Sequence, residues 1–129
     1  MKKAINSVNA PKAIGPYSQA VLAGNYLYVS GQLPLDSVSG TIVDGGIEAQ
    51  ARQVFINLKA ILNEAGCDLS NVIKTTVLLS DIGDFSKVNE IYSEYFQNGV
   101  LPARAAYQVA ALPKNALVEI ELVAYIANE

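Results

Sequence analysis

The sequence predicts an α+β fold, in which one mixed β-sheet packs against two helices that lie on the same face. Two segments have the residue spacing of amphipathic helices, and five shorter segments are rich in the residues typical of strands. These elements follow the order β-β-α-β-α-β-β, with only short Gly, Pro and Ser interruptions between them. The chain of 129 residues is therefore expected to form a single domain over residues 1–129.

The first two predicted strands, residues 18–23 and 26–31, are expected to form a hairpin. They flank Gly24 and Asn25, and a Gly-Asn pair between strand-like segments is a good signal for a two-residue turn.

Two turn motifs flank this hairpin and include polar side chains. Gly15-Pro16 forces a bend, and Tyr17 follows it where the first strand is expected to begin. Ser30 and Gly31 end the second strand with a hydroxyl group and with a residue that lets a ligand approach the backbone. On pattern alone, the first motif is an ordinary turn with a core tyrosine, and the second is a simple turn or bulge.

The two helices are predicted from their apolar stripes and their end signals. Apolar residues recur at helical spacing over residues 47–65, and Gly66 stands at the position that commonly ends a helix. The second helix is expected to begin after Asp84 as its N-cap and to end at residues 98–99, an Asn-Gly pair.

Three further strands are predicted at residues 71–80, 104–110 and 117–127. In the last of them, Glu119 and Glu121 alternate with apolar residues that should meet the helices. The two glutamates are therefore expected on the face that the helices leave open, and a partner subunit is an economical cover for that face.

Arg104, one of only two arginines, stands at the start of a small, apolar strand. A guanidinium in an apolar neighbourhood needs a carboxylate, which either the protein or a ligand supplies. Arg104 shares a strand face with Ala106 and Gln108, and we expect it to point to the same side as Glu119. The residues alone leave three interpretations open: a structural Arg–Glu pair, solvated charges on an open sheet face, or a ligand site.

Composition excludes several kinds of chemistry. The chain has no histidine, so no Ser-His-Asp or Cys-His arrangement exists, and zinc would need unusual carboxylate-only ligation. No glycine-rich nucleotide-binding motif is present. The net charge of −3 and the scattered lysines argue against nucleic acid as a partner.

The cellular compartment of the protein is inferred from its number of cysteines and from the length of its apolar stretches. The single cysteine, Cys67, excludes an internal disulfide and fits a reducing cytosol. The N-terminus lacks the apolar core of a signal peptide, and no apolar stretch approaches the ~20 residues that cross a bilayer. We therefore expect a cytoplasmic protein with no membrane partner.

Five motifs, taken in order, resemble the reactive intermediate deaminase (YjgF/RidA) family. They are NAPKAIGPYSQAV, YVSGQLPLD, QARQVFINLKAILNEAG, KTTVLLSDIGDFSKVNEIY and PARAAYQVAALPKNALVEIE, and they match from Ala10 to Glu121. The resemblance implies a chorismate-mutase-like fold with a six-stranded mixed sheet, assembled as a homotrimer with three clefts between subunits. It also implies hydrolysis of 2-iminopropanoate and 2-iminobutanoate, small 2-imino acids, to 2-oxo acids and ammonia, with no cofactor and no metal.

The resemblance also implies roles for individual residues. Arg104 matches the position that binds the substrate carboxylate, and Glu119 matches the residue that holds the hydrolytic water. Tyr17 is expected to take part in catalysis, with its hydroxyl near the water or the departing nitrogen. The remaining expected substrate-binding positions are Ser30, Gly31, Asn89 and Ala106.

One departure from the family pattern is visible. Many members have Ser-Cys where this chain has Ala105-Ala106, so the cleft lacks a thiol. Because hydrolysis by water does not need that thiol, we expect activity to survive. Two alternatives remain open: a non-catalytic protein that binds small carboxylates such as 2-oxo acids, and RNA cleavage, which the acidic composition disfavours.

Overall fold

The structure is a computed structural model that describes residues 1–127, and it confirms the α+β fold. The strands are β1 (Lys2–Ile5), β2 (Ala20–Ala23), β3 (Tyr26–Gln32), β4 (Val72–Leu79), β5 (Ala103–Gln108) and β6 (Val118–Tyr125), and the helices are α1 (Gly46–Glu64) and α2 (Phe85–Tyr95). They form one six-stranded sheet in the order β1-β2-β3-β6-β4-β5. Among the strand pairs of residues 1–127, β4 and β5 alone run parallel, so the sheet is mixed.

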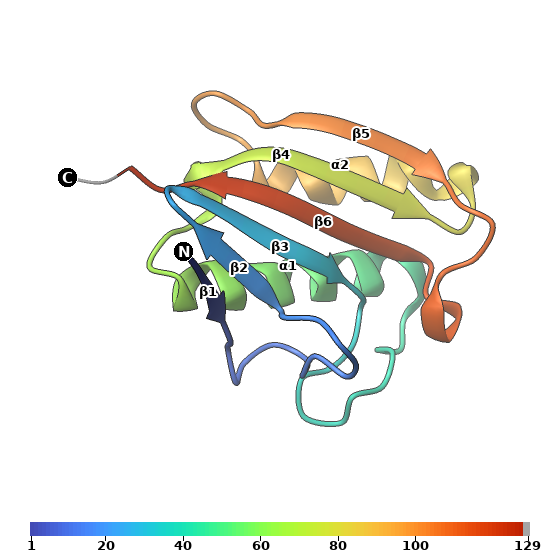
Figure 1. Cartoon of the computed structure of the whole chain (residues 1–129). Helices are drawn as coiled ribbons and strands as arrows, with labels where there is room; N and C mark the ends of the chain where they lie inside the picture. The colour runs from blue at the N-terminus through green and yellow to red at the C-terminus, as the bar shows by residue number, and fades with distance from the viewer. Residues whose placement is uncertain (128–129) are drawn as a thin grey trace.

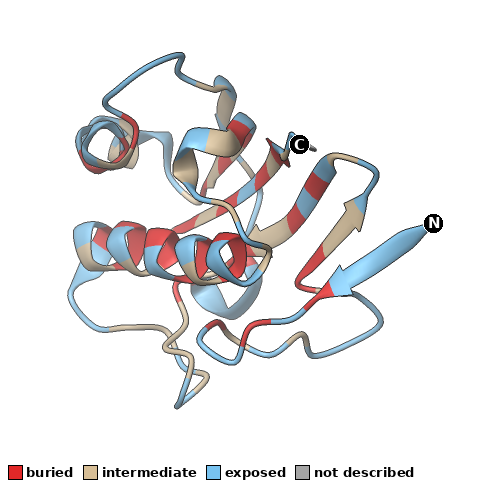
Figure 2. Ribbon diagram, turned by 90° about the vertical axis from the view of Figure 1, so that its left-hand side faces the viewer, coloured by how far each residue is buried: buried red, intermediate tan, exposed pale blue. Residues whose placement is uncertain are grey.

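Both helices lie on the same side of the sheet, behind it in Figure 1. Buried and exposed residues alternate along the helices and strands, as Figure 2 shows. The apolar stripe of α1 is buried as predicted, and Phe55, Leu58 and Ile61 are fully enclosed. The core therefore lies between the helices and one face of the sheet, which holds that face rigid.

In the part of the chain that the structure describes, no helix covers the second face of the sheet (Figure 1). Four tyrosines stand 39–54% exposed on β3, β5 and β6, namely Tyr26, Tyr28, Tyr107 and Tyr125. On β6, Glu119 and Glu121 lie on this face and alternate with buried residues, as the sequence predicted. No helix among residues 1–127 is both long enough and apolar enough to span a bilayer.

Several predicted boundaries were wrong for identifiable reasons. The pattern predicted no strand at β1, because this edge strand has four residues, three of them exposed, and thus no alternation to detect. Strand β2 begins at Ala20 and not at residue 18, so Tyr17 lies in a loop. Helix α2 ends at Tyr95, short of the predicted stop, because Phe96 leaves the helical conformation and packs in the core.

The hairpin and the bulge were predicted correctly. Gly24, in the left-handed region at φ +60°, and Asn25 join β2 to β3. The pairing of β3 with β6 shifts register between Val29 and Gln32, which is a bulge at Ser30 and Gly31. This bulge lies beside the start of β6, where Glu119 stands.

Candidate active site

Arg104 and Glu119 lie on opposite faces of the sheet, so the expectation that they point to the same side was wrong. Arg104 is opposite Thr75 of β4, a buried residue whose hydroxyl lies 2.7 Å from that of Tyr92 on α2. Arg104 therefore faces the helices. Glu119 is opposite Leu78 of β4 and alternates along β6 with residues buried under the helices. Alternation shows which residues of one strand share a face, but it does not give the register between strands.

The guanidinium of Arg104 is held by three side chains of α2. Its Nη1 donates a 2.6 Å hydrogen bond to Oδ1 of Asn89. Its central carbon lies 4.7 Å from the ring centroid of Tyr92 and 5.4 Å from that of Phe85. Among residues 1–127, no carboxylate forms an ion pair with it. The structural Arg–Glu pair considered from the sequence is therefore absent from the described chain, and the guanidinium remains available to an anion.

Beside Arg104 is a hollow of about 380 Å³, which we call the arginine pocket. It is lined by Asn89, Tyr92, Ser93, Phe96, Leu101, Pro102 and Arg104. Most of its wall is apolar, so a bound carboxylate would be partly removed from water. Removal from water strengthens the attraction between a carboxylate and a guanidinium.

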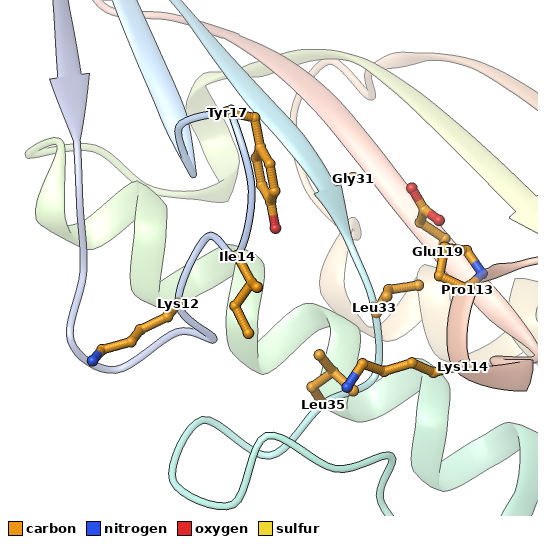
Figure 3. A pocket seen from close by; sticks show the side chains of 9 residues that line it. All are labelled: Lys12, Ile14, Tyr17, Gly31, Leu33, Leu35, Pro113, Lys114 and Glu119. Carbon is orange, nitrogen blue, oxygen red and sulfur yellow. The ribbon is translucent and has the colours of Figure 1, made fainter.

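Glu119 stands in a separate hollow of about 450 Å³, which we call the glutamate pocket. It is lined by Lys12, Ile14, Tyr17, Gly31, Leu33, Leu35, Pro113, Lys114 and Glu119, shown in Figure 3. Tyr17 and Glu119 lie on either side of Gly31 in this view. The two lysines offset the negative charge of Glu119, so the pocket does not simply repel an anionic ligand.

Burial raises the pKa of Glu119, and the negative charge of Glu121 raises it further. A carboxyl group with a raised pKa exchanges protons more readily near neutral pH than an ordinary glutamate. No hydrogen bond from residues 1–127 stabilises its charged form. Its oxygens are therefore free to accept a hydrogen bond from water, as a residue that orients water must.

Gly31 is needed because Glu119 occupies the space beside it. A Cβ atom placed on Gly31 would lie 2.9 Å from Cδ of Glu119, which is closer than two carbon atoms approach without repulsion. The glutamate side chain is flexible, so a larger residue at position 31 would displace the carboxylate and leave the backbone in place.

We predict that Gly31→Ala lowers kcat about tenfold and leaves the melting temperature almost unchanged, because a small displacement of a catalytic group is costly for the reaction. Thermal unfolding measures the melting temperature, and semicarbazide competition in a dehydratase reaction measures kcat for imine hydrolysis. Full activity in a folded variant would show that the position of Glu119 is not critical.

Three buried polar residues that the sequence analysis missed hold the loops of the glutamate pocket. The amide of Asn57 on α1 donates to the carbonyls of Leu33 and Leu35, at 3.1 and 3.0 Å. Gln50 accepts a 2.8 Å hydrogen bond from the N–H of Leu117, just before β6. Asn57 and Gln50 lie on the buried side of α1. A polar residue at a position where the helical spacing predicts an apolar one was the sequence signal that could have identified these loop anchors.

The third residue, Gln19, fixes the loop that carries Tyr17. Its side chain accepts from the N–H of Ser7 at 2.7 Å and donates to the carbonyls of Ser7 and Pro11, at 3.1 and 2.9 Å. Gln19 is 2% exposed, so these bonds are shielded from water and strongly orient the loop.

Ser30 and Ala106, the remaining predicted positions, line neither pocket. The Ser30 hydroxyl donates a 2.6 Å hydrogen bond to the carbonyl of Ser18, which leaves its lone pairs for an incoming N–H group. Ala106 is opposite Val77 and packs against the core on the face of Arg104. Residues 1–127 include no group of three or more potential ligands arranged to hold a metal ion.

One chain therefore presents two separate half-sites, one with a cation free to bind a carboxylate and one with a carboxylate free to orient water. Together the two half-sites define an α+β protein with pockets of a size and chemistry suited to a small ligand that bears an acid group. The family model described as Endoribonuclease L-PSP matches residues 7–126, and the chain belongs to this family. This confirms the resemblance seen in the sequence.

Known relatives match over nearly the whole chain. The 2-iminobutanoate/2-iminopropanoate deaminase of Rattus norvegicus is 59% identical over 124 residues, which cover 96% of this chain and 90% of that protein. A crystal structure of YyfA from Yersinia pestis, described as a member of the conserved Rid protein family, has a TM-score of 0.95 at 46% identity and covers 98% of this chain and 100% of its own. The structure of E. coli TdcF with bound serine has a TM-score of 0.91 at 39% identity. The match covers 97% of this chain and 99% of the TdcF chain.

Proposed function

We propose that this protein hydrolyses small 2-imino acids, 2-iminopropanoate and 2-iminobutanoate, to 2-oxo acids and ammonia. The observation that carries the proposal is the guanidinium of Arg104, which is fixed by α2 but has no carboxylate partner among residues 1–127. The rat relative is named for this activity, and the E. coli relative was solved with serine, a small amino acid.

Arg104 binds the substrate carboxylate in this proposal. A guanidinium offers two parallel N–H donors that match the two oxygens of a carboxylate. Such a pair fixes the plane of the acid group and with it the position of the adjacent C=N carbon. A protonated imine is already a strong electrophile, so the main task of the site is to place water beside it.

Glu119 orients the water and moves protons. Its carboxylate accepts a hydrogen bond from the water whose oxygen attacks the imine carbon, and it takes one proton as the C–O bond forms. The resulting carbinolamine carries both hydroxyl and amine on one carbon. Return of that proton to nitrogen turns the amine into a leaving group. As the C–N bond breaks, ammonia departs and the hydroxyl proton passes to Glu119, which leaves the carbonyl of the 2-oxo acid. Tyr17, which lines this pocket, and Ser30, next to Gly31, bind the water or the departing nitrogen in this proposal.

The two half-sites meet only if different copies of the chain supply them. Within one chain, the sheet itself separates Arg104 from Glu119. The family resemblance implies a homotrimer, and four exposed tyrosines on the open sheet face are aromatic surface of the kind enriched in protein interfaces. A ring of three subunits in head-to-tail contact would form three equivalent sites, each with Arg104 from one copy and Glu119 from its neighbour.

The direct test adds the protein to a serine or threonine dehydratase reaction that contains semicarbazide. Semicarbazide traps the imine, so a deaminase lowers the rate of semicarbazone formation and speeds release of the 2-oxo acid. No change on addition of the wild-type protein would contradict the proposal. Calorimetric binding of 2-oxobutanoate without any imine hydrolysis would instead support the non-catalytic carboxylate binder.

Glu121→Gln is expected to shift the acid limb of the kcat/KM profile to lower pH. The charge of Glu121 raises the pKa of Glu119, so its removal lowers that pKa and keeps Glu119 ionised at lower pH. The imine substrate titrates in the same way with both proteins, so the difference between the two pH profiles reports the pKa of Glu119. An unchanged acid limb would show that Glu119 does not control it.

A further inference from the structure

The guanidinium of Arg104 rests against one stripe of α2. Phe85, Asn89 and Tyr92 are spaced four and three residues apart, so they lie on one face of the helix, and each contacts Arg104. The two rings contact the guanidinium while Asn89 accepts one N–H from its edge. The remaining N–H donors have no partner among residues 1–127. This leaves part of the guanidinium edge for a planar acid group.

Tyr92 is itself the most firmly held member of this stripe. Its hydroxyl is hydrogen-bonded to that of Thr75 at 2.7 Å, and Thr75 is 1% exposed. Its ring packs edge-on against Phe55, with centroids 5.9 Å apart, and lies 4.8 Å from Phe96. Burial raises the pKa of the Tyr92 phenol, so the group remains a neutral hydroxyl at physiological pH. The ring plane that Arg104 meets is therefore set by the core.

We infer that Tyr92 is a positioning residue that orients the Arg104 guanidinium for the substrate carboxylate. The inference rests on the proposed role of Arg104. An arginine free in solvent samples many rotamers, and a ligand that fixes one of them loses affinity. Contact with Tyr92, supported by Phe85, restricts those rotamers before the ligand arrives. The cation–π attraction uses the ring face and leaves N–H groups free for two parallel hydrogen bonds.

The test is a double-mutant cycle measured by calorimetric binding of 2-oxobutanoate, the product acid. Tyr92→Leu is expected to weaken binding about fivefold in the wild-type background, the size of a partly buried cation–π contact. In the Arg104→Lys background, the same change is expected to alter binding by less than about twofold, because a flexible, strongly hydrated ammonium does not stack in this way. Tyr92→Phe keeps the ring and is expected to bind within about twofold of wild type.

Tyr95→Leu is the matched control. Tyr95 belongs to the same helix and stacks on Phe55 at 4.3 Å, but it has no contact with Arg104. We expect wild-type affinity for 2-oxobutanoate in this variant. If Tyr92→Leu does not fold, Phe85→Leu provides the same cycle, with an expected loss of about threefold in the wild-type background and no change in the Arg104→Lys background.

Three results would overturn the inference: equal effects of Tyr92→Leu in both backgrounds, an equal loss in Tyr95→Leu, or unchanged affinity in folded Tyr92→Leu. A failure of the proposed function is a different result, because the wild-type protein would then not hydrolyse the imine at all, whatever Tyr92→Leu does to the binding of 2-oxobutanoate.

Discussion

Arg104→Ala is expected to lower kcat/KM for 2-iminobutanoate about 10²–10⁴-fold. Each hydrogen bond between charged groups contributes about 1.5–3 kcal/mol, and the substitution removes two of them together with the orientation that they impose. Semicarbazide competition in the dehydratase reaction measures the loss. The fold should persist, because Arg104 is an exposed residue of an edge strand.

Arg52→Ala is the control for this prediction, since it removes the only other arginine. Arg52 forms an exposed ion pair with Glu94 at 2.9 Å, on the outer surface of the helices. Exposed pairs of this kind contribute little to stability. The Arg52 variant should therefore hydrolyse the imine at the wild-type rate. Equal losses in both variants would mean that arginine removal acts through the fold or the net charge and not through a bound carboxylate.

Glu119→Gln is expected to lower kcat about 100-fold, within the range of a lost general acid–base group. Glutamine has nearly the same shape but cannot take a proton from water or return one to nitrogen. Binding of 2-oxobutanoate should change much less, since Arg104 holds the acid group. A variant that retains kcat would exclude Glu119 from proton transfer.

The same substitution is expected to stabilise the fold at neutral pH. Burial raises the folded-state pKa of Glu119 above its ordinary value of 4.5, so stability falls as the pH rises from 4.5 to that raised pKa and stays lower above it. Neutral glutamine removes this cost. The gain in unfolding free energy should therefore appear at pH 7 and vanish below about pH 4, where the carboxyl is protonated in both states. Glu121→Gln should keep its activity at pH 7 and show that charge removal alone does not inactivate the enzyme.

The fold was predictable from the sequence where a pattern was long enough to read. The stripe of α1 and the alternation of β6 each extend over eight or more residues, and both are confirmed. The four residues of β1 carry no such pattern, and their pairing with β2 is a tertiary property. The end of α2 was also missed, since burial of Phe96 among other aromatic rings outweighs helix continuation.

The site was harder to predict than the fold. Family resemblance pointed to Arg104, Asn89 and Glu119, but residue spacing placed Arg104 on the wrong face. Strand register depends on contacts between distant segments, such as Thr75 with Arg104, which periodicity does not encode. Asn57 and other polar residues that anchor the loops were missed because only the apolar members of the α1 stripe were considered.

The most direct test of the account is activity in mixed oligomers. Arg104→Ala and Glu119→Gln are each expected to be nearly inactive alone. Refolded together in equal amounts, they should recover about a quarter of wild-type activity, because a head-to-tail site is intact whenever an Arg104-bearing copy meets a Glu119-bearing neighbour. If both residues serve one site within a single chain, every site carries a lesion and the mixture remains inactive, which would contradict the shared site.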